Sequence, residues 1–221
     1  MPKKVLFWLI IIYIVLFYTG CGSEPPYYRV LPVPFFWAEG YQWCTVACIQ
    51  MWAHYDGNTH VGQAEIASYV GVPTLPDDAV NGVNYFTDSA GWMEWEPDTK
   101  YGQELTIASS IACVDDRCPS IIPVHGGTHA ILAIGFKWHR NAMGTPIADF
   151  MTSHDPDQGE RLEMTGDRLM NHYFLPVQSR YYVIVGARWH VTRGASGLAD
   201  YKAAGGTYYG EDPDDPTVPQ Q

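Results

Sequence analysis

The sequence predicts an α+β fold in which helices pack on one side of a mostly antiparallel sheet. Helix-like periodicity comes first, between residues 43 and 113, and strand-like runs follow from residue 120 onward. The chain has 221 residues, of which 47% are hydrophobic, so it is long enough for one domain with a substantial core. The net charge of −11 argues against a nucleic-acid partner, because no basic surface is available to neutralise phosphates.

The first 20 residues have the layout of an export signal, with a positive start, an apolar segment and small residues before a cleavage point. The apolar segment, residues 5–18, is shorter than the roughly 20 residues that a spanning helix needs. Cys21 follows a Thr-Gly pair and resembles a lipobox cysteine, although Tyr18 stands where leucine is usual. We therefore expect residues 1–20 to be a signal peptide and Cys21 to carry lipid, which predicts a membrane-anchored lipoprotein of the bacterial cell envelope. A plain signal peptide, giving a secreted protein, and an uncleaved anchor are the alternatives.

Composition divides the rest of the chain into three parts. Residues 21–33 contain several prolines, which prevent a helix, so we expect an extended tether. Residues 194–221 have no hydrophobic period and are rich in glycine, proline and acid, which predicts a disordered acidic tail. The folded domain is expected at residues 34–193.

The helices are expected in the first part of this domain. A helix over residues 43–55 is ended by Asp-Gly-Asn, and a second in VGQAEIASYVGVP is closed by Gly71 and Pro73. A third is expected over residues 102–113. Residues 74–100 are expected to be rich in loops, with a short helix near VNYFTDSAG as an option. Four strand-like runs then follow: SIIPV, HAILAIGFKW, IADFMTSHD and YYVIVGARWHV.

Cys44 stands at the expected start of the first helix, directly after Trp43. A helix N-terminus carries a partial positive charge and free N–H groups, which stabilise a thiolate and can receive the oxyanion of an acyl intermediate. Cys44 is therefore a candidate nucleophile. A buried core cysteine is the alternative, and it is the better interpretation of Cys48, one turn further along the same helix.

Two further residues complete a pattern. His129 opens the most apolar strand directly after a Gly-Gly-Thr loop, and two glycines let a substrate or another backbone approach closely. Asp155 ends the next strand before Pro156, where a carboxylate can orient an imidazole and stabilise its charged form. A core histidine and an ordinary Asp-Pro turn are the alternatives for each residue taken alone.

In this order, the segments VPFFWAEGYQWCTVACIQM, HAILAIGF and the Asp-Pro pair resemble the papain-like cysteine peptidases, and most closely the bacterial branch that includes the double-glycine leader peptidases. The resemblance covers about residues 32–190. It implies a papain-like fold whose central helix is headed by the nucleophile Cys44. It also implies that His129 pairs with the thiolate and that Asp155 orients His129. The implied activity is hydrolysis of peptide or protein substrates through an acyl-thioester.

The family usually places a glutamine, which lines the oxyanion hole, about six residues before the cysteine. Here that position is Ala38. Either Gln42 supplies an amide instead or the hole relies on main-chain N–H groups, with Trp43 and Gly127 lining the cleft. A catalytically weak or inactive papain-like fold, acting as a binding lipoprotein of the cell envelope, is therefore the alternative function.

Cys113 and Cys118 flank a plausible turn, and we expect a local disulfide between them in an exported chain. Together with His125 and His129 they also match a C-x4-C-x6-H-x3-H zinc spacing. Two histidines four residues apart face the same way only on a helix, and HGGTH is a poor helix, so we expect no metal and no cofactor. Bacterial cell-wall peptidases and transglutaminase-like proteins also place a cysteine before a histidine, but with tighter spacing.

Overall fold

The computed structural model describes residues 26–188. The expected signal peptide, Cys21 and the expected acidic tail lie outside these residues. The helices are α2 (Cys44–Tyr55), α3 (Gln63–Val70), α4 (Pro76–Phe86), α5 (Lys100–Asp115) and the short α6 (Gly166–Arg168). The strands are β1 (Tyr27–Val30), β2 (Ser89–Pro97), β3 (Ser120–Val124), β4 (His129–Arg140), β5 (Pro146–Asp155), β6 (Gly159–Thr165) and β7 (Arg180–Arg188). Within residues 26–188, no helix is long and apolar enough to cross a membrane.

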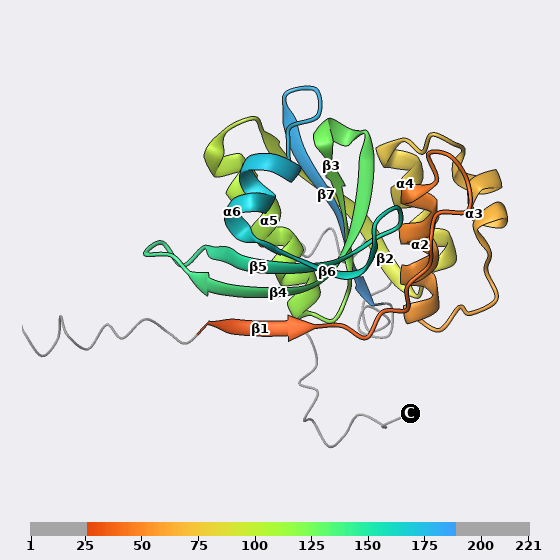
Figure 1. Cartoon of the computed structure of the whole chain (residues 1–221), viewed down its shortest axis with the longest axis horizontal. Helices are drawn as coiled ribbons and strands as arrows, with labels where there is room; N and C mark the ends of the chain where they lie inside the picture. The colour runs from red at the N-terminus through yellow and green to blue at the C-terminus, as the bar shows by residue number, and fades with distance from the viewer. Residues whose placement is uncertain (1–25, 189–221) are drawn as a thin grey trace, which may run out of the picture.

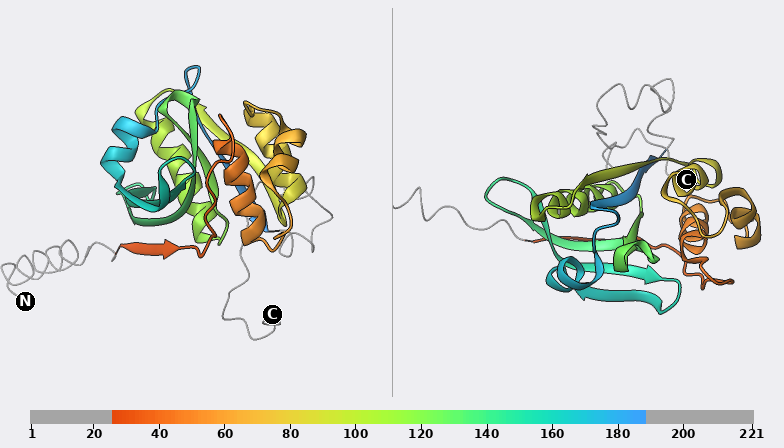
Figure 2. Two further views of the ribbon diagram at one scale, coloured as in Figure 1. Left: turned by 45° about the vertical axis from the view of Figure 1, so that its right-hand side comes forward. Right: turned by 90° about the horizontal axis from the view of Figure 1, so that it is seen from above.

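The predicted α+β architecture is confirmed. The strands form one seven-stranded sheet in the order β2-β7-β3-β4-β5-β6, with β1 added beside β4, and every pairing is antiparallel. Helices α2, α3 and α4 form a group at one side of the molecule, while α5 packs across β7, β2, β4 and β5 (Figure 1, Figure 2).

The expectation that residues 74–100 are rich in loops is wrong, although the optional short helix near VNYFTDSAG overlaps the end of α4. Pro76 stands in the first turn of α4 and two acidic residues, Asp77 and Asp78, follow it, which favours a helix N-terminus. Strand β2 then pairs with β7 along its whole length, from Ser89 to Pro97. The acidic and glycine residues of this stretch hid both elements, because cross-strand pairing rather than intrinsic propensity stabilises β2.

Two further strands, β1 and β6, were not expected. Strand β1 lies inside the stretch 21–33; it is extended, as the prolines predict, but it pairs with β4, with Tyr27 opposite Trp138. Strand β6, with the sequence GERLEMT, has little apolar alternation, and its pairing with β5 forms a hairpin that begins at Gly159. Both strands gain order from their neighbour on the sheet.

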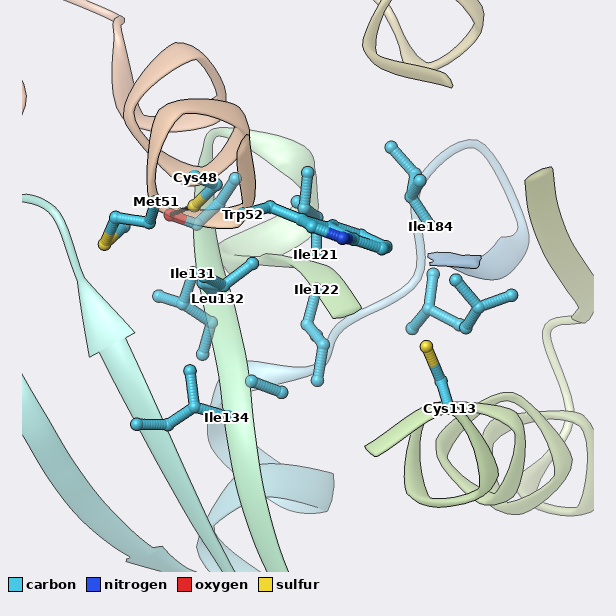
Figure 3. Packing of buried hydrophobic residues seen from close by; sticks show 14 of the residues in the cluster. Cys48, Met51, Trp52, Cys113, Ile121, Ile122, Ile131, Leu132, Ile134 and Ile184 are labelled. Atoms are coloured by element: carbon cyan, nitrogen blue, oxygen red, sulfur yellow. Dashed lines mark hydrogen bonds between the residues drawn. The ribbon is translucent and has the colours of Figure 1, made fainter. Parts of the chain in front are cut away.

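Trp52 fixes α2 on the sheet. Its ring is fully buried and lies close to Ile121 and Ile184 in the core (Figure 3). Its Nε1 donates to Ser89 Oγ at 3.3 Å. A Cβ at Gly186 would come within 2.9 Å of the ring, so glycine is required where the Trp52 side chain packs on β7. This contact sets the position of the helix whose first residue is Cys44.

Candidate active site

Cys44 is the first residue of α2, as predicted. The chain reaches it through a tight turn in which the Trp43 N–H donates to the Gly40 carbonyl at 3.2 Å. The Trp43 ring lies over Gly40, since a Cβ there would come within 2.7 Å of the ring. Gln42 adopts a positive φ of 62° and is exposed. The thiol is thus held at a helix N-terminus and is partly accessible, unlike that of Cys48, which is fully buried.

His129 and Asp155 meet across two paired strands. His129 opens β4 and Asp155 ends β5, as the sequence predicts, and the two strands run antiparallel as direct neighbours. His129 Nε2 lies 2.9 Å from Asp155 Oδ1. The exposed fractions of the two side chains are 13% and 4%, so the pair is largely shielded from water. This geometry orients the imidazole ring through a charged hydrogen bond.

The turn after β5 keeps the Asp155 carboxylate ionised. Asp155 Oδ1 also accepts the N–H groups of Asp157 at 2.9 Å and Gln158 at 3.2 Å. Burial alone would raise the pKa of Asp155, but the hydrogen bond with His129 and these two amides outweigh it and lower the pKa. The carboxylate is therefore a fixed negative charge beside His129.

The Cys44 thiol interacts with His129. Burial opposes ionisation of the thiol, but its hydrogen bond to His129, the charge on that ring and the backbone amides of Ala130 and Thr45 together lower the pKa of Cys44. Burial also disfavours the charged imidazole, yet the hydrogen bonds with Asp155 and Cys44 raise the pKa of His129 to about 10. The site therefore favours a thiolate–imidazolium pair.

A buried glutamine network, which the sequence reasoning missed, holds the segment before Cys44. Gln63 Nε2 donates to the Trp37 carbonyl at 2.7 Å and to Gln50 Oε1 at 2.9 Å, and its Oε1 accepts the Glu39 N–H at 2.9 Å. Only 1% of Gln63 is exposed. A polar residue among the inward-facing positions of an amphipathic helix is the signal that points to such a role.

The same segment contacts the loop that carries Asp155. The N–H of Ala38, the residue at the family's usual glutamine position, donates to the Pro156 carbonyl at 3.0 Å. The chain before the nucleophile and the turn after Asp155 are therefore tied together by the main chain. Ala38 itself offers no side-chain donor to the site.

The other two histidines of this region have different surroundings. His154 is buried, its Nε2 lies 2.9 Å from the Val33 carbonyl and its Nδ1 accepts the Arg161 N–H at 3.1 Å. His125 is exposed in the 3-10 turn His125–Gly127, and its ring contacts Tyr173. Neither ring makes the contacts of His129.

A small cavity lies beside Thr45 and Ala130, the residues that follow Cys44 and His129 in the chain. It has a volume of about 20 Å³ and is lined by Thr45, Thr74, Pro76, Ala79, Ile121, Pro123, Ala130, Tyr182 and Ile184. Burial and the nearby charge of Cys44 raise the pKa of Tyr182. Gly127, one of the residues expected to line the cleft, stands in the turn before β4 with a φ of 83°. It lies against the side chain of Val177.

Cys113 and Cys118 are both free and buried in the structure, so the expected disulfide is not formed in it. The Cys113 thiol donates to the Pro119 carbonyl at 3.2 Å and accepts the Gly186 N–H at 3.3 Å. The four residues of the zinc spacing are not brought together, because His129 is part of the site described above. Among the described residues, no group of three or more cysteine, histidine or acidic side chains could hold a metal ion.

The fold is similar to solved structures at low sequence identity. A double-glycine-motif protease from an AMS/PCAT transporter, crystallised with the leader peptide, has a TM-score of 0.51 and 13% identity, covering 74% of this chain and 97% of that chain. UfSP from C. elegans has a TM-score of 0.50 and 11% identity, covering 77% of this chain but 36% of that chain. No family model matches the chain, and no curated protein does. The chain therefore has the α+β fold of papain-like cysteine peptidases.

Proposed function

We propose that the protein is a cysteine peptidase that is exported and anchored in a bacterial cell-envelope membrane through lipid on Cys21. One arrangement carries the peptidase proposal: Cys44 heads α2, the neighbouring His129 helps to lower its pKa, and His129 Nε2 lies 2.9 Å from Asp155 Oδ1. A nucleophile, a base and an orienting carboxylate in this order are the parts that acyl transfer requires.

In the proposed reaction, the Cys44 thiolate attacks the peptide carbonyl carbon and forms a tetrahedral oxyanion. Charged His129 gives its proton to the leaving amine as the C–N bond breaks, which leaves a thioester on Cys44 and a neutral imidazole. Neutral His129 then takes a proton from water, which attacks the thioester and releases the acid product and the thiolate. Asp155 keeps the ring oriented and stabilises its charged form throughout.

The oxyanion would be held mainly by the main chain. The first N–H groups of a helix have no intrahelical partner, and at α2 they point toward the position of the nucleophile. Ala38 has no amide side chain, while Gln42 is exposed two residues before Cys44 and is the side chain that can supply one. Loss of one such donor typically costs about 10²–10³ in rate.

Peptides with short side chains near the scissile bond are the substrates we propose. The solved relative with its leader peptide supports a peptide substrate in general. The cavity beside Thr45 and Ala130 has a volume of about 20 Å³, and a cavity of at least about 10–15 Å³ is needed to hold one water molecule. A large side chain does not fit there without movement of α4 or β7.

The alternative is a binding lipoprotein with the same fold, and the alanine at position 38 favours it. The two functions differ in the reactivity of one thiol. A peptide carrying a thiol-reactive electrophile should label Cys44 below neutral pH if the thiolate is activated.

The test combines this label with two variants. Cys44→Ala should abolish both labelling and peptide hydrolysis, because alanine is tolerated at a helix start but cannot attack. Cys48→Ala, in the same helix, is the matched control and should keep both, since burial raises the pKa of that thiol. Hydrolysis retained in Cys44→Ala would exclude the nucleophile, and an unlabelled, folded and reduced wild-type protein would favour the binding function.

A further inference from the structure

Charge is unevenly distributed along this acidic chain. Residues 117–148 contain no aspartate or glutamate. This stretch includes β3, β4 and the turn that joins β4 to β5. The first acidic residue of the β4–β5 hairpin is therefore Asp149, on β5. Asp149 Oδ1 lies 2.9 Å from His139 Nδ1 and is thereby occupied. The outer part of the hairpin, residues 137–148, therefore carries two cations, Lys137 and Arg140, and no acidic residue, whereas Asp149 and Asp155 follow on β5.

Two cations on this surface have no ion-pair partner among the described residues. Lys137 pairs across the sheet with Phe150, and its Nζ lies 5.9 Å from the centre of that ring. Arg140 donates to the carbonyl of Gly144 within the hairpin turn. By contrast, Arg29 on β1 binds Asp115 at the end of α5. Lys137 and Arg140 therefore present charge that the protein itself does not neutralise.

Exposed apolar side chains lie beside Lys137 and in the hairpin turn next to Arg140. Tyr28 is opposite Lys137, and Lys137 is opposite Phe150, so the three form one row across β1, β4 and β5. Tyr28 is 67% exposed and Phe150 is 44% exposed. Met143, in the hairpin turn, is 74% exposed. Aromatic and long apolar groups interspersed with lysine and arginine are typical of surfaces that lie at a membrane interface.

The hairpin also encloses a hollow. An open recess of about 560 Å³ is lined by Pro26, His139, Arg140, Asn141, Ala142, Gly144 and Asp149. Arg140 lines this recess together with the His139–Asp149 pair, and Pro26 is the first residue that the structure describes. A guanidinium in an open recess can bind the phosphate of a headgroup through two parallel hydrogen bonds.

The position of this surface fits the sequence that precedes it. Strand β1 begins on the same side of the molecule as the hairpin turn (Figure 1), and Tyr27 stacks on Trp138 with ring centroids 5.4 Å apart. Tyr27 is the sixth residue after Cys21, so at most about 20 Å of chain joins them. The apolar segment 5–18 lies only a few residues further back. Membrane attachment at either place keeps the hairpin close to a bilayer.

We propose that the β4–β5 hairpin and β1 form a docking surface for anionic phospholipid headgroups, with Lys137 and Arg140 binding the phosphates and Tyr28, Phe150 and Met143 contacting the acyl boundary. This inference rests on the proposed attachment of the N-terminal segment to a membrane and not on peptidase activity. Each cation near an anionic bilayer contributes a factor of roughly five to binding.

Hydrogen exchange of the full-length chain tests this proposal. The chain is reconstituted in vesicles of phosphatidylcholine and in vesicles that also contain phosphatidylglycerol, and flotation first establishes that residues 1–25 attach it to both. Amides of residues 139–146 should then exchange several-fold more slowly on the anionic vesicles, and high salt should abolish the difference. Equal exchange on both kinds of vesicle overturns the proposal.

Charge reversal provides the matched controls. Lys137→Glu combined with Arg140→Glu should remove the protection, whereas Lys100→Glu, at the exposed start of α5, should keep it. Protection that increases with the protein-to-lipid ratio would mean that a second copy covers the hairpin, and this result too overturns the proposal. Hydrolysis of a soluble peptide should be unchanged in all three substitutions. An inactive wild-type protein with a protected hairpin would refute only the proposed peptidase function.

Discussion

The ring of His129 gives its two nitrogens different surroundings. Nε2 lies 2.9 Å from Asp155 Oδ1, and Nδ1 lies 3.5 Å from the exposed carboxylate of Asp157. The charged form of the ring is therefore supported from both sides. Burial disfavours the charged ring, but the interactions with Asp155 and Cys44 raise the pKa of His129 to about 10, and this value sets the pH range over which the pair with Cys44 exists.

The pH profile of Cys44 alkylation should depend on one histidine. Cys44 should react as a thiolate well below its ordinary pKa of 9.0, because the charged ring stabilises that form. In His129→Ala the profile should move up to 9.0 or above, since burial then acts alone, and peptide hydrolysis should fall by about 10²–10⁴. The measurement is the rate of alkylation at a series of pH values.

His125→Ala and His154→Ala serve as controls for this prediction. His125 is exposed on its turn, and both nitrogens of His154 are already engaged with the main chain, so neither should move the profile by much. A shift in His125→Ala without one in His129→Ala would mean that the base has been assigned to the wrong residue.

Asp155 and Asp157 should differ in how strongly they affect the fall of kcat/KM at high pH, which is called the basic limb of the profile. The proton that goes to the leaving amine is present below the folded pKa of His129, so hydrolysis should fall as pH rises through about 10. Asp155→Asn keeps an oxygen for the amides of Asp157 and Gln158 but removes the charge. The basic limb should therefore move to lower pH in a profile of kcat/KM.

Asp157→Asn is the matched substitution. The Asp157 carboxylate is 61% exposed and 3.5 Å from the ring, so water screens its charge and the limb should move much less. A larger shift in Asp157→Asn than in Asp155→Asn would show that Asp157, not Asp155, is the carboxylate that stabilises the charged ring.

The elements that carry the site were predictable because each site residue stands at a boundary marked by its neighbours. At Cys44 a helix begins directly after a turn, and its N-terminus carries a partial positive charge. A glycine loop precedes His129, and Pro156 ends the strand after Asp155. Strands β1, β2 and β6 were not, because their order comes from pairing with β4, β7 and β5 rather than from an apolar alternation of their own. The Gln63 network was missed for the same reason: its partners lie in other elements.

The packing of the Trp52 side chain on β7 should be sensitive to a single methyl group. Gly186→Ala would place a Cβ about 2.9 Å from the Trp52 ring and 3.0 Å from the Ala90 carbonyl, so the helix must shift. We expect a loss of about 1–3 kcal/mol in the free energy of unfolding and reduced hydrolysis, because Cys44 moves with the helix. Urea unfolding with activity assays on the folded fraction measures both.

Gly62→Ala is the control for this prediction. Nothing lies within 4 Å of a Cβ at Gly62, which has a φ of −106° before α3, so the loss should stay below about 1 kcal/mol. Equal stability of Gly186→Ala and Gly62→Ala would contradict the role of the Trp52 contact in positioning α2.

On the scale of the whole molecule, attachment to a membrane depends on residues before the described domain. Cys21→Ser removes the thiol that the proposed lipid requires and should release the protein from membranes into the soluble fraction. Sodium carbonate extraction followed by blotting measures the distribution. Persistence of the variant in the membrane fraction would argue against lipidation and for residues 5–18 as a true anchor.

Strand β4 has a consequence for the reach of the protein. The strand begins at His129 in the site and ends at Arg140 beside the hairpin turn, twelve residues in all. At about 3.3 Å per residue it spans at most about 36 Å, and less where it bends. With the hairpin lying on lipid as proposed, the length of β4 sets the distance between the bilayer and the site at His129. Under the proposed peptidase function, polypeptide that lies flat on the same surface would escape cleavage, and segments that stand clear of it would come within range.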